Sequence, residues 1–288
     1  MIEPGAISSN GISIVVVAHN SEDQLDACVA TLAADDHNDV EVIVVDSGSF
    51  AAPLVAPGVR LLTLPNLGYG TAINEASKVA AGGWMVFMNP DVRVSVRELV
   101  TMRDIARAHS LSMIAPSLRD SRGTPARHFD KLPRPPWRQE WWSEPEGSAG
   151  DYTPEMSIQG SVVLVRLSVF RDLNGFDSRY FLYFEEIDLA RRFWEAGHLV
   201  ASTERASAMH IGEGSSDVPG AFRLAERARG KFNYLLKFYS RPEASMALIL
   251  DVLLATRRYG LRTGLAVVRQ LRRNPRPDLH IPTLAAVL

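Results

Sequence analysis

Two adjacent carboxylates lie in an unusually aromatic stretch of the sequence. Glu185 and Glu186 fall within segment 176–188, which also contains five aromatic residues. Burial among rings and repulsion between like charges are expected to raise the pKa of one carboxyl group towards neutrality. A carboxylate of that kind suits a general base. Asp188 has a structural alternative, because it lies four residues before Arg192 and can pair with it on a helix.

A second group of residues has the character of a divalent-metal site. Asp91 follows the stiff Pro90 after an apolar run, where a carboxylate can hold a hard cation that also contacts a diphosphate. Such a cation neutralises charge that develops on a leaving group. His210 is a candidate second ligand, although a lone histidine is more often structural. The alternative for Asp91 is a polar residue at the start of a helix.

Polar residues also follow the first two apolar runs. His19-Asn20-Ser21 comes after one run, and Asp46-Ser47-Gly48-Ser49 comes after the next. Ligands of open α/β sheets bind beyond the carboxyl ends of the strands, so Asp46 is a candidate acceptor of hydrogen bonds from a base or ribose. The alternative is local, with Asn20 or Ser21 capping a helix and Asp46 closing a turn. Dinucleotide dehydrogenases and P-loop enzymes are disfavoured, because their glycine-rich and Walker motifs are missing.

Alternating strands and helices must position these residues. Short apolar, mostly β-branched runs predict strands over 12–18, 42–45, 59–64, 84–88, 112–115 and 161–165. Helical periodicity predicts helices over 23–34, 70–81 and 96–109, one ending near 196, and a helical region from 222 to about 273. This order predicts an α/β fold with a mostly parallel sheet flanked by helices and a C-terminal helical appendix.

One stretch interrupts the alternation. Residues 116–157 carry seven of the 17 prolines and three of the five tryptophans. The prolines predict a long loop, and loops of this length are usually functional or disordered. The tryptophans argue against disorder.

Composition and charge restrict the function classes. The single cysteine excludes an internal disulfide and a cysteine-based zinc site, which favours a reducing cytoplasmic compartment. We find no signal peptide, and no apolar run reaches the roughly 20 residues of a membrane span. The net charge of −2 gives no overall basic field for nucleic acid.

The charge is unevenly distributed, at −7 over residues 1–240 and +5 over residues 241–288. Apolar residues and arginines are interspersed over 253–273, which is typical of a helix at a membrane interface. The tail is therefore expected to associate with an anionic membrane surface. The alternative is that its apolar residues pack on the preceding α/β part of the chain or on a second subunit of a homodimer.

Taken in order, these segments resemble the family 2 glycosyltransferases, the inverting nucleotide-sugar enzymes of GT-A fold. The resemblance covers roughly residues 11–216 and rests on segments 14–21, 45–49, 66–74, 89–92 and 175–189, with His210. The runs Asn66-Leu67-Gly68-Tyr69-Gly70 and Asn89-Pro90-Asp91 are most similar to bacterial rhamnosyltransferases that act on polyprenyl-diphosphate-linked cell-wall acceptors. The resemblance implies a catalytic domain over 1–216, with a nucleotide-sugar half (11–115) and an acceptor half (116–216), followed by a helical region over 217–288.

The resemblance also implies roles for individual residues. The nucleotide sugar would contact Ala18, His19, Asn20, Asp46, Asn66, Gly68, Asn74 and Asn89. Mg²⁺ or Mn²⁺ would be held by Asp91 and His210, and the acceptor would contact Gly160, Ser161, Trp141 and Trp142. Glu186 stands where the family usually has the aspartate of a Glu-Asp pair and is assigned as the base, with Glu185 as the fallback. Asn89 replaces a first aspartate that many relatives have, so the metal loses one anionic contact.

The expected activity is transfer of a sugar, such as rhamnose from dTDP-rhamnose, to a hydroxyl of a glycan or lipid-linked acceptor in cell-wall or polysaccharide assembly. The alternatives are another donor, such as a UDP-sugar, or a noncatalytic nucleotide-sugar-binding protein on the same fold. A nucleotidyltransferase is disfavoured, because no glycine-rich basic phosphate loop follows the first strand. The expected location is cytoplasmic, at the inner face of the cell membrane, with no nucleic-acid partner.

Overall fold

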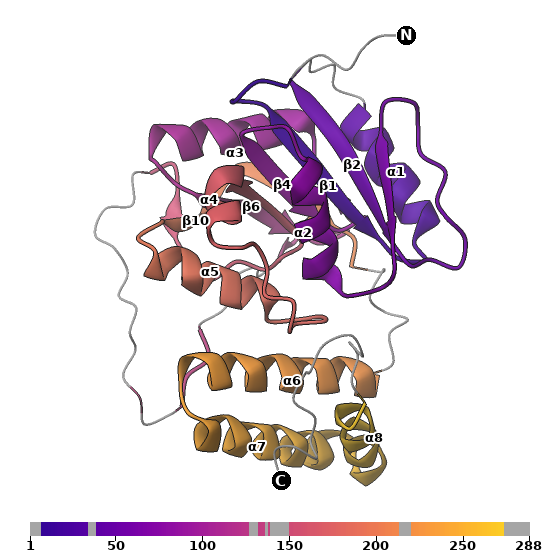
Figure 1. Cartoon of the computed structure of the whole chain (residues 1–288), viewed down its shortest axis with the longest axis vertical. Coiled ribbons are helices and arrows are strands. Elements are labelled where there is room, and N and C mark those ends of the chain that lie inside the picture. Colours follow the sequence, from indigo (N-terminus) through magenta and orange to yellow (C-terminus); the bar gives the residue numbers. More distant parts are fainter. Residues whose placement is uncertain are drawn as a thin grey trace.

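A computed structural model describes residues 7–33, 39–126, 132–135, 138, 150–212 and 220–273. A central mixed sheet runs in the order β3-β2-β1-β4-β9-β6-β10-β5, with β7 paired to β6 and β8 paired to β10 (Figure 1). The strands are β1 (Ile12–Ala18), β2 (Val40–Ser47), β3 (Arg60–Leu64), β4 (Trp84–Met88), β5 (Val92–Arg93), β6 (Met113–Arg119), β7 (Pro125–Ala126), β8 (Thr153–Pro154), β9 (Val162–Arg166) and β10 (Val200–His210).

Parallel pairing brings the carboxyl ends of several strands to one edge of the sheet. Strand β1 runs parallel to β2 and β4, β2 runs parallel to β3, and β6 runs parallel to β10. Strand β9 is antiparallel to both β4 and β6. The predicted α/β sheet is therefore confirmed as a mixed sheet, in which β1, β2, β3 and β4 pair in parallel and β9 lies antiparallel between β4 and β6. Its register aligns Ala18 with Asp46, so the loops that follow β1 and β2 begin side by side.

Helices cover both faces of the sheet. Helices α1 (Glu22–Ala33) and α3 (Val96–Ala108) bury their apolar sides in one cluster. Helices α2 (Tyr69–Val79), α4 (Leu167–Asp172) and α5 (Glu185–Glu195) bury theirs in a second cluster on the other face. The strands between the layers are apolar on both sides, as expected for a sheet covered twice.

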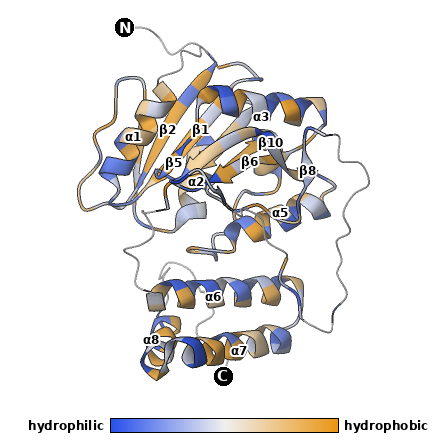
Figure 2. Cartoon of the chain, turned by 180° about the vertical axis from the view of Figure 1, so that it is seen from behind, coloured by the Kyte–Doolittle hydropathy of each residue, from blue (hydrophilic) through white to orange (hydrophobic). Residues whose placement is uncertain are grey.

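A third layer of helices lies beyond α5, as Figure 1 shows. It consists of α6 (Gly220–Phe238), α7 (Arg241–Tyr259) and α8 (Leu261–Leu271), which confirms the predicted helical appendix. The α6 side of this layer shares an apolar cluster with Tyr180 and Ile187 of segment 176–188, hereafter the acidic segment. Figure 2 shows α7 and α8 farthest from the sheet, with apolar stretches along both helices.

Two predictions about elements are corrected. The loop predicted from residue 116 begins too early, because β6 continues to Arg119 and the short β7 and β8 lie within the stretch. Strand β10 was not predicted at all. Its sequence has few β-branched residues, and a register shift between Thr203 and Ser207 breaks its pairing with β6. Pairing with β6, β5 and β8 stabilises the strand in place of local propensity.

Candidate active site

The loops after β1 and β2 are tied together by hydrogen bonds. Asp46 is buried, and its Oδ1 accepts a bond from the Ser49 amide at 3.0 Å, which is the turn-closing contact foreseen as the alternative for this residue. His19 Nδ1 lies 2.8 Å from the Ser47 carbonyl oxygen. Asn20 Oδ1 accepts from the Phe50 amide at 2.8 Å. These contacts build a polar rim at the carboxyl edge of β1 and β2, where open α/β sheets bind ligands.

The glycine run that follows β3 joins this rim to the acidic segment. The amide of Asn66 approaches Gly48 so closely that a Cβ on Gly48 would lie 2.8 Å from its nitrogen. Gly68 has φ +98°, and a Cβ there would lie 2.5 Å from the carbonyl oxygen of Phe181. The Tyr69 amide donates to that same oxygen at 3.2 Å. Only glycine allows this approach, so Gly68 serves packing whether or not it also contacts a ligand.

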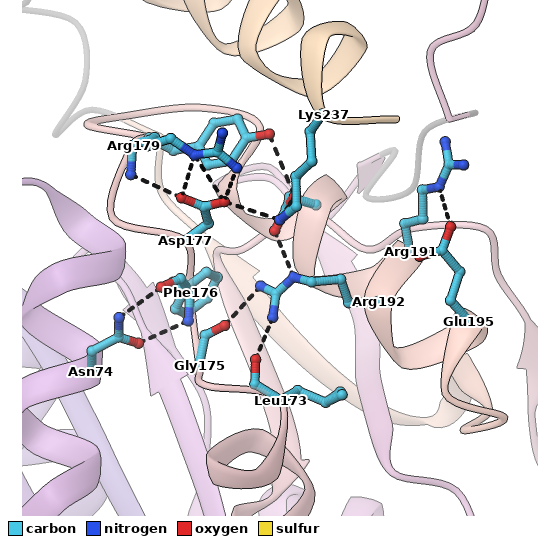
Figure 3. Close-up of polar contacts among 12 residues, drawn as sticks. Asn74, Leu173, Gly175, Phe176, Asp177, Arg179, Arg191, Arg192, Glu195 and Lys237 are labelled. Atoms are coloured by element: carbon cyan, nitrogen blue, oxygen red, sulfur yellow. Dashed lines mark hydrogen bonds and ion pairs between the residues drawn. The ribbon is translucent and has the colours of Figure 1, made fainter. Parts of the chain in front are cut away.

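Asn74 has a structural role that the sequence did not indicate. Its Nδ2 donates to the carbonyl oxygen of Phe176 and its Oδ1 accepts from the amide of Phe176, both at 2.8 Å (Figure 3). The side chain therefore clamps the start of the acidic segment onto α2. Its assignment to the nucleotide sugar stays a prediction, with both polar atoms of the amide already bonded here.

Asp91 and His210 are brought together by the pairing of β5 with β10. Strand β5 pairs antiparallel with the end of β10, and the amide of Ile211 donates to the Asp91 carbonyl oxygen at 3.0 Å. This pairing brings His210 Nε2 to 3.2 Å from Asp91 Oδ2. Asp91 Oδ1 is buried and accepts no hydrogen bond from the residues that the structure describes.

This pair fits a divalent cation. A buried carboxylate oxygen without a donor is costly unless a cation compensates it. No group of three or more His, Cys, Asp or Glu residues suited to a metal is found among the described residues. Mg²⁺ characteristically takes only one or two carboxylates from a protein and completes its shell with water and substrate phosphates. One carboxylate and one imidazole suit such a shared site better than a closed structural one.

The two glutamates begin α5 immediately after a strained piece of backbone. Tyr183 and Phe184 have backbone φ values of +68° and +74°, which residues other than glycine rarely adopt. Each such residue costs about 1–3 kcal/mol and persists only where its surroundings enforce it. Here α6 does so, because its Gly230 packs against the Tyr183 carbonyl oxygen, 2.7 Å from where a Cβ would stand. The strained turn therefore sets the direction of α5 and the positions of its first two side chains, Glu185 and Glu186.

Glu185 and Glu186 differ in environment. Glu185 is 5% exposed, and its Oε2 has no hydrogen-bond donor within the described residues. Burial and the neighbouring Glu186 raise the pKa of Glu185 well above its usual value. Glu186 is half-buried and reaches Gly160, since a Cβ on Gly160 would lie 3.6 Å from the Glu186 Cβ. Glu186 is thus the more exposed residue of the two, although its Oε2 is also buried, and burial favours the protonated form of Glu185 more than that of a solvated glutamate.

Tyr69 is a site residue that the sequence analysis did not single out. Its hydroxyl donates to the Gly160 carbonyl oxygen at 2.9 Å. Burial raises the pKa of Tyr69, and the charges of Glu185, Glu186 and Asp91 add to this effect. Tyr69 therefore lies within electrostatic reach of both the acidic pair and the candidate metal ligand Asp91. Its position between Gly68 and Gly70 is the sequence feature that could have identified it, because both glycines make room for residues of the acidic segment.

The acceptor-side predictions are placed only in part. Gly160 lies against Glu186, as described, and the Ser161 carbonyl oxygen accepts from the Asn89 amide at 2.9 Å. Asn89 and Ser161 thereby link the loop that carries Asp91 to the start of β9, while their predicted ligand roles stay predictions. Trp141 and Trp142 lie outside the described residues.

A network of charges holds the acidic segment against α6, as Figure 3 shows. Asp188 accepts from Arg192 Nε at 2.7 Å and from Lys237 Nζ at 2.6 Å, so its predicted structural pairing is confirmed. Lys237 also donates to Asp177 at 3.0 Å. Hydrogen bonds from Arg179 and Lys237 outweigh burial and hold the pKa of Asp177 well below its usual value. Lys237 was not predicted, since an isolated lysine on a helix carries no motif.

The sequence matches the family described as Glycosyl transferase family 2 over residues 13–173, more than half of the chain. The chain belongs to glycosyl transferase family 2. This matched region ends before the acidic segment and before the C-terminal helices. As a member of the family the protein is a glycosyltransferase, and the GT-A fold expected from the resemblance is confirmed.

Similar proteins extend the comparison over nearly the whole chain. N-acetylglucosaminyl-diphospho-decaprenol L-rhamnosyltransferase of Mycobacterium tuberculosis is 30% identical over 94% of this chain and 97% of its own. Rhamnosyltransferase WbbL of Escherichia coli is 24% identical over 78% of this chain and 93% of its own. The solved mannosyltransferase PcManGT of Pyrobaculum calidifontis, in complex with GDP-Man and Mn²⁺, shares the fold with a TM-score of 0.56 at 12% identity, over 93% of this chain and 80% of its own.

Proposed function

We propose that this family 2 glycosyltransferase is an inverting rhamnosyltransferase that acts on a sugar linked through a diphosphate to a polyprenol. The similarity to the mycobacterial N-acetylglucosaminyl-diphospho-decaprenol L-rhamnosyltransferase carries this proposal, because it spans the catalytic domain and the helical appendix together. The geometry supports the chemistry, since Asp91 of the candidate cation site contacts His210, and both Asp91 and the carboxylate pair are in electrostatic reach of Tyr69.

In the proposed reaction Glu186 accepts the proton of the acceptor hydroxyl. The acceptor oxygen then bonds to the anomeric carbon as the bond from that carbon to the diphosphate oxygen breaks, which inverts the configuration. Asp91 and His210 would hold a divalent cation, which supplies positive charge to the departing nucleoside diphosphate. The polar rim around Asp46 and His19 would bind the nucleotide, and the acceptor would lie by Gly160, whose missing Cβ would otherwise contact Glu186 and Tyr69.

The test is a panel of donors offered with one lipid-linked acceptor. We expect transfer of rhamnose from dTDP-rhamnose to N-acetylglucosaminyl-diphospho-polyprenol, detected as a product heavier by one deoxyhexose in mass spectrometry and as released dTDP. If transfer occurred only from a UDP-sugar, the proposed donor would be wrong and the UDP-sugar would take its place. Donor binding without transfer or release of nucleoside diphosphate, across the panel, would instead indicate a noncatalytic binding protein.

We also propose that α7 and α8 lie on an anionic membrane surface. Eight large apolar side chains on them are 45–68% exposed: Met246, Ile249, Leu250, Leu253, Leu254, Tyr259, Leu261 and Leu265. Seven arginines are exposed over the same span: Arg241, Arg257, Arg258, Arg262, Arg269, Arg272 and Arg273. The described acids among them are engaged, Glu243 with Arg138 and Asp251 with Lys231. In the described part of the chain no helix is both long and apolar enough to traverse a bilayer.

Charge favours a lipid surface over a second copy of the chain, because a symmetric contact would set these arginines against one another. We expect the protein to sediment with vesicles containing phosphatidylglycerol at low salt, and far less at high salt, where screening is strong. Leu250→Glu with Leu253→Glu should abolish sedimentation, whereas Leu54→Glu, at a residue 92% exposed in another part of the chain, should leave it unchanged. A wild-type protein that stays in the supernatant and elutes as a dimer would contradict the membrane assignment.

A further inference from the structure

A polar cavity lies at the edge of the sheet where β4 begins and β9 ends. Its volume of about 430 Å³ falls within the range of small-molecule sites. Six of the residues that line it carry the argument: Ser9, Asn10, Trp84, Arg107, Arg166 and Arg171. Among the described residues that line the cavity, three are arginines and none is an Asp or Glu.

This cavity is separate from the candidate active site. Trp84 is the first residue of β4, and the other end of that strand leads to Asp91. Arg166 is the last residue of β9, and the other end of that strand follows Gly160 and Ser161. Strands of five residues are roughly 15 Å long, so a ligand in the cavity would lie at the opposite edge of the sheet from the cation site and the acidic pair.

The three arginines come from different parts of the fold. Arg107 belongs to the last turn of α3, which covers one face of the sheet. Arg171 belongs to α4 on the other face, and Arg166 ends the strand between them. The edge of the sheet therefore collects positive charge from both of its faces.

Two of these guanidinium groups have hydrogen-bonding capacity to offer a ligand. Arg166 Cζ lies 4.8 Å from the centre of the Trp84 ring, which supports the guanidinium by a cation–π contact and uses none of its N–H donors. Within the described part of the chain, the guanidinium groups of Arg107 and Arg166 donate no hydrogen bond. Planar groups in this state can donate to an oxyanion without first breaking a contact in the protein.

Arg171 is partly engaged. Its Nε donates to the Ser77 carbonyl oxygen at 3.0 Å, and its Nη2 donates to the Ala80 carbonyl oxygen at 2.9 Å. Both acceptors lie at the end of α2, so these bonds hold the Arg171 side chain in place. Its charge remains uncompensated by either contact, because both acceptors are neutral.

Acidic residues close to this edge in the sequence do not neutralise the cavity. Asp104 pairs with Arg103 at 2.8 Å, and Asp39 accepts two hydrogen bonds from Ser8. Asp172 is exposed at the end of α4 and does not line the cavity.

We propose that this cavity binds a small phosphate-bearing anion, held by the guanidinium groups of Arg107 and Arg166 in the positive field to which Arg171 adds. Guanidinium groups suit phosphate oxygens, because their planar donors form charge-assisted, often bidentate hydrogen bonds. The hydroxyl of Ser9 and the side-chain amide of Asn10 lie on the same wall-forming segment and supply neutral donors. The site does not rest on the proposed function, since it shares no residue with the candidate active site.

Inorganic diphosphate is the probe, measured by calorimetry at low and constant ionic strength. The protein is kept free of metal, so that diphosphate cannot bind through a cation at Asp91. The test variant is Arg107→Gln with Arg166→Gln, which removes both charges and leaves the carbonyl contacts of Arg171 intact. Arg257→Gln with Arg258→Gln, two exposed arginines of α7, is the matched control for net charge.

We expect the wild type and the α7 variant to bind diphosphate alike, and the cavity variant to bind it at least about tenfold more weakly, because hydrogen bonds to charged groups are lost. An unchanged unfolding temperature and unchanged binding of dTDP with Mn²⁺ in the cavity variant show that its fold is intact. Wild-type protein that binds no diphosphate, equal binding by the cavity variant, or an equal loss in the α7 variant would overturn the proposal.

Vesicles containing phosphatidylglycerol identify the source of the phosphate. If diphosphate binding depends on the two arginines and the cavity variant sediments with the vesicles as the wild type does, the ligand is a soluble phosphate compound. Sedimentation that falls with diphosphate binding in the cavity variant would support the same site with a lipid headgroup as its ligand.

Discussion

Glu186→Gln is expected to lower kcat by at least about 10²-fold, within the 10²–10⁴-fold range typical of a lost general base. The amide keeps the shape of the side chain beside Gly160 but cannot accept the proton of the acceptor hydroxyl. The donor KM and the unfolding temperature should remain close to those of the wild type, because the polar rim that would bind the nucleotide follows β1 and β2, whereas Glu186 belongs to α5. The measurement is steady-state transfer with a saturating lipid-linked acceptor.

Glu185→Gln is the matched control for this prediction. Because burial and Glu186 raise the pKa of Glu185, its neutral form is favoured more than that of a solvated glutamate, and glutamine reproduces that form in size and charge. We therefore expect Glu185→Gln to keep kcat within about tenfold of the wild type. If Glu185→Gln were inactive while Glu186→Gln turned over normally, the base would be Glu185. Near-normal turnover in both variants would show that neither Glu185 nor Glu186 is the general base.

Much of the fold could be predicted because its signals are local. The bounds of β1 and β4 agree with prediction to the residue, since both strands are short and almost wholly apolar between turn residues. Strand β10 could not be predicted, because its pairing with β6 decides its structure rather than its own composition. The antiparallel direction of β9 is likewise a property of the assembled sheet.

The candidate site likewise has features that local sequence reveals and features that only contacts between distant elements create. Carboxylates and a histidine at expected positions were recognisable, and the pairing of β5 with β10 then explains why Asp91 and His210 meet. The strained turn at Tyr183, the clamp made by Asn74 and the contribution of Lys237 were not recognisable. Each depends on contacts between elements far apart in the sequence: α2 with the acidic segment, and α6 with both ends of it.

Asp91→Asn is expected to abolish metal-assisted binding of the donor nucleotide. Asparagine fills the same volume but removes the negative charge that a hard cation requires. In the wild type we expect Mn²⁺ and dTDP each to strengthen the binding of the other, measured by calorimetry with and without the second ligand. The coupling should fall at least about tenfold in the variant, and transfer should fall with it. Asp104→Asn, at an exposed acid of α3 paired with Arg103, is the control and should preserve the coupling.

Stability distinguishes a ligand from a structural residue at this position. Asp91 Oδ1 is buried with no donor among the described residues, and an unpaired buried carboxylate oxygen is costly. Without metal or nucleotide, Asp91→Asn should therefore unfold at the same temperature as the wild type or higher. With both ligands present the order should reverse, because only the wild type gains the stabilisation that bound ligand gives to the folded state. A variant that is less stable in the absence of ligands, or wild-type transfer that continues in excess chelator, would contradict a metal role and leave the Asp91–His210 contact as a purely structural ion pair.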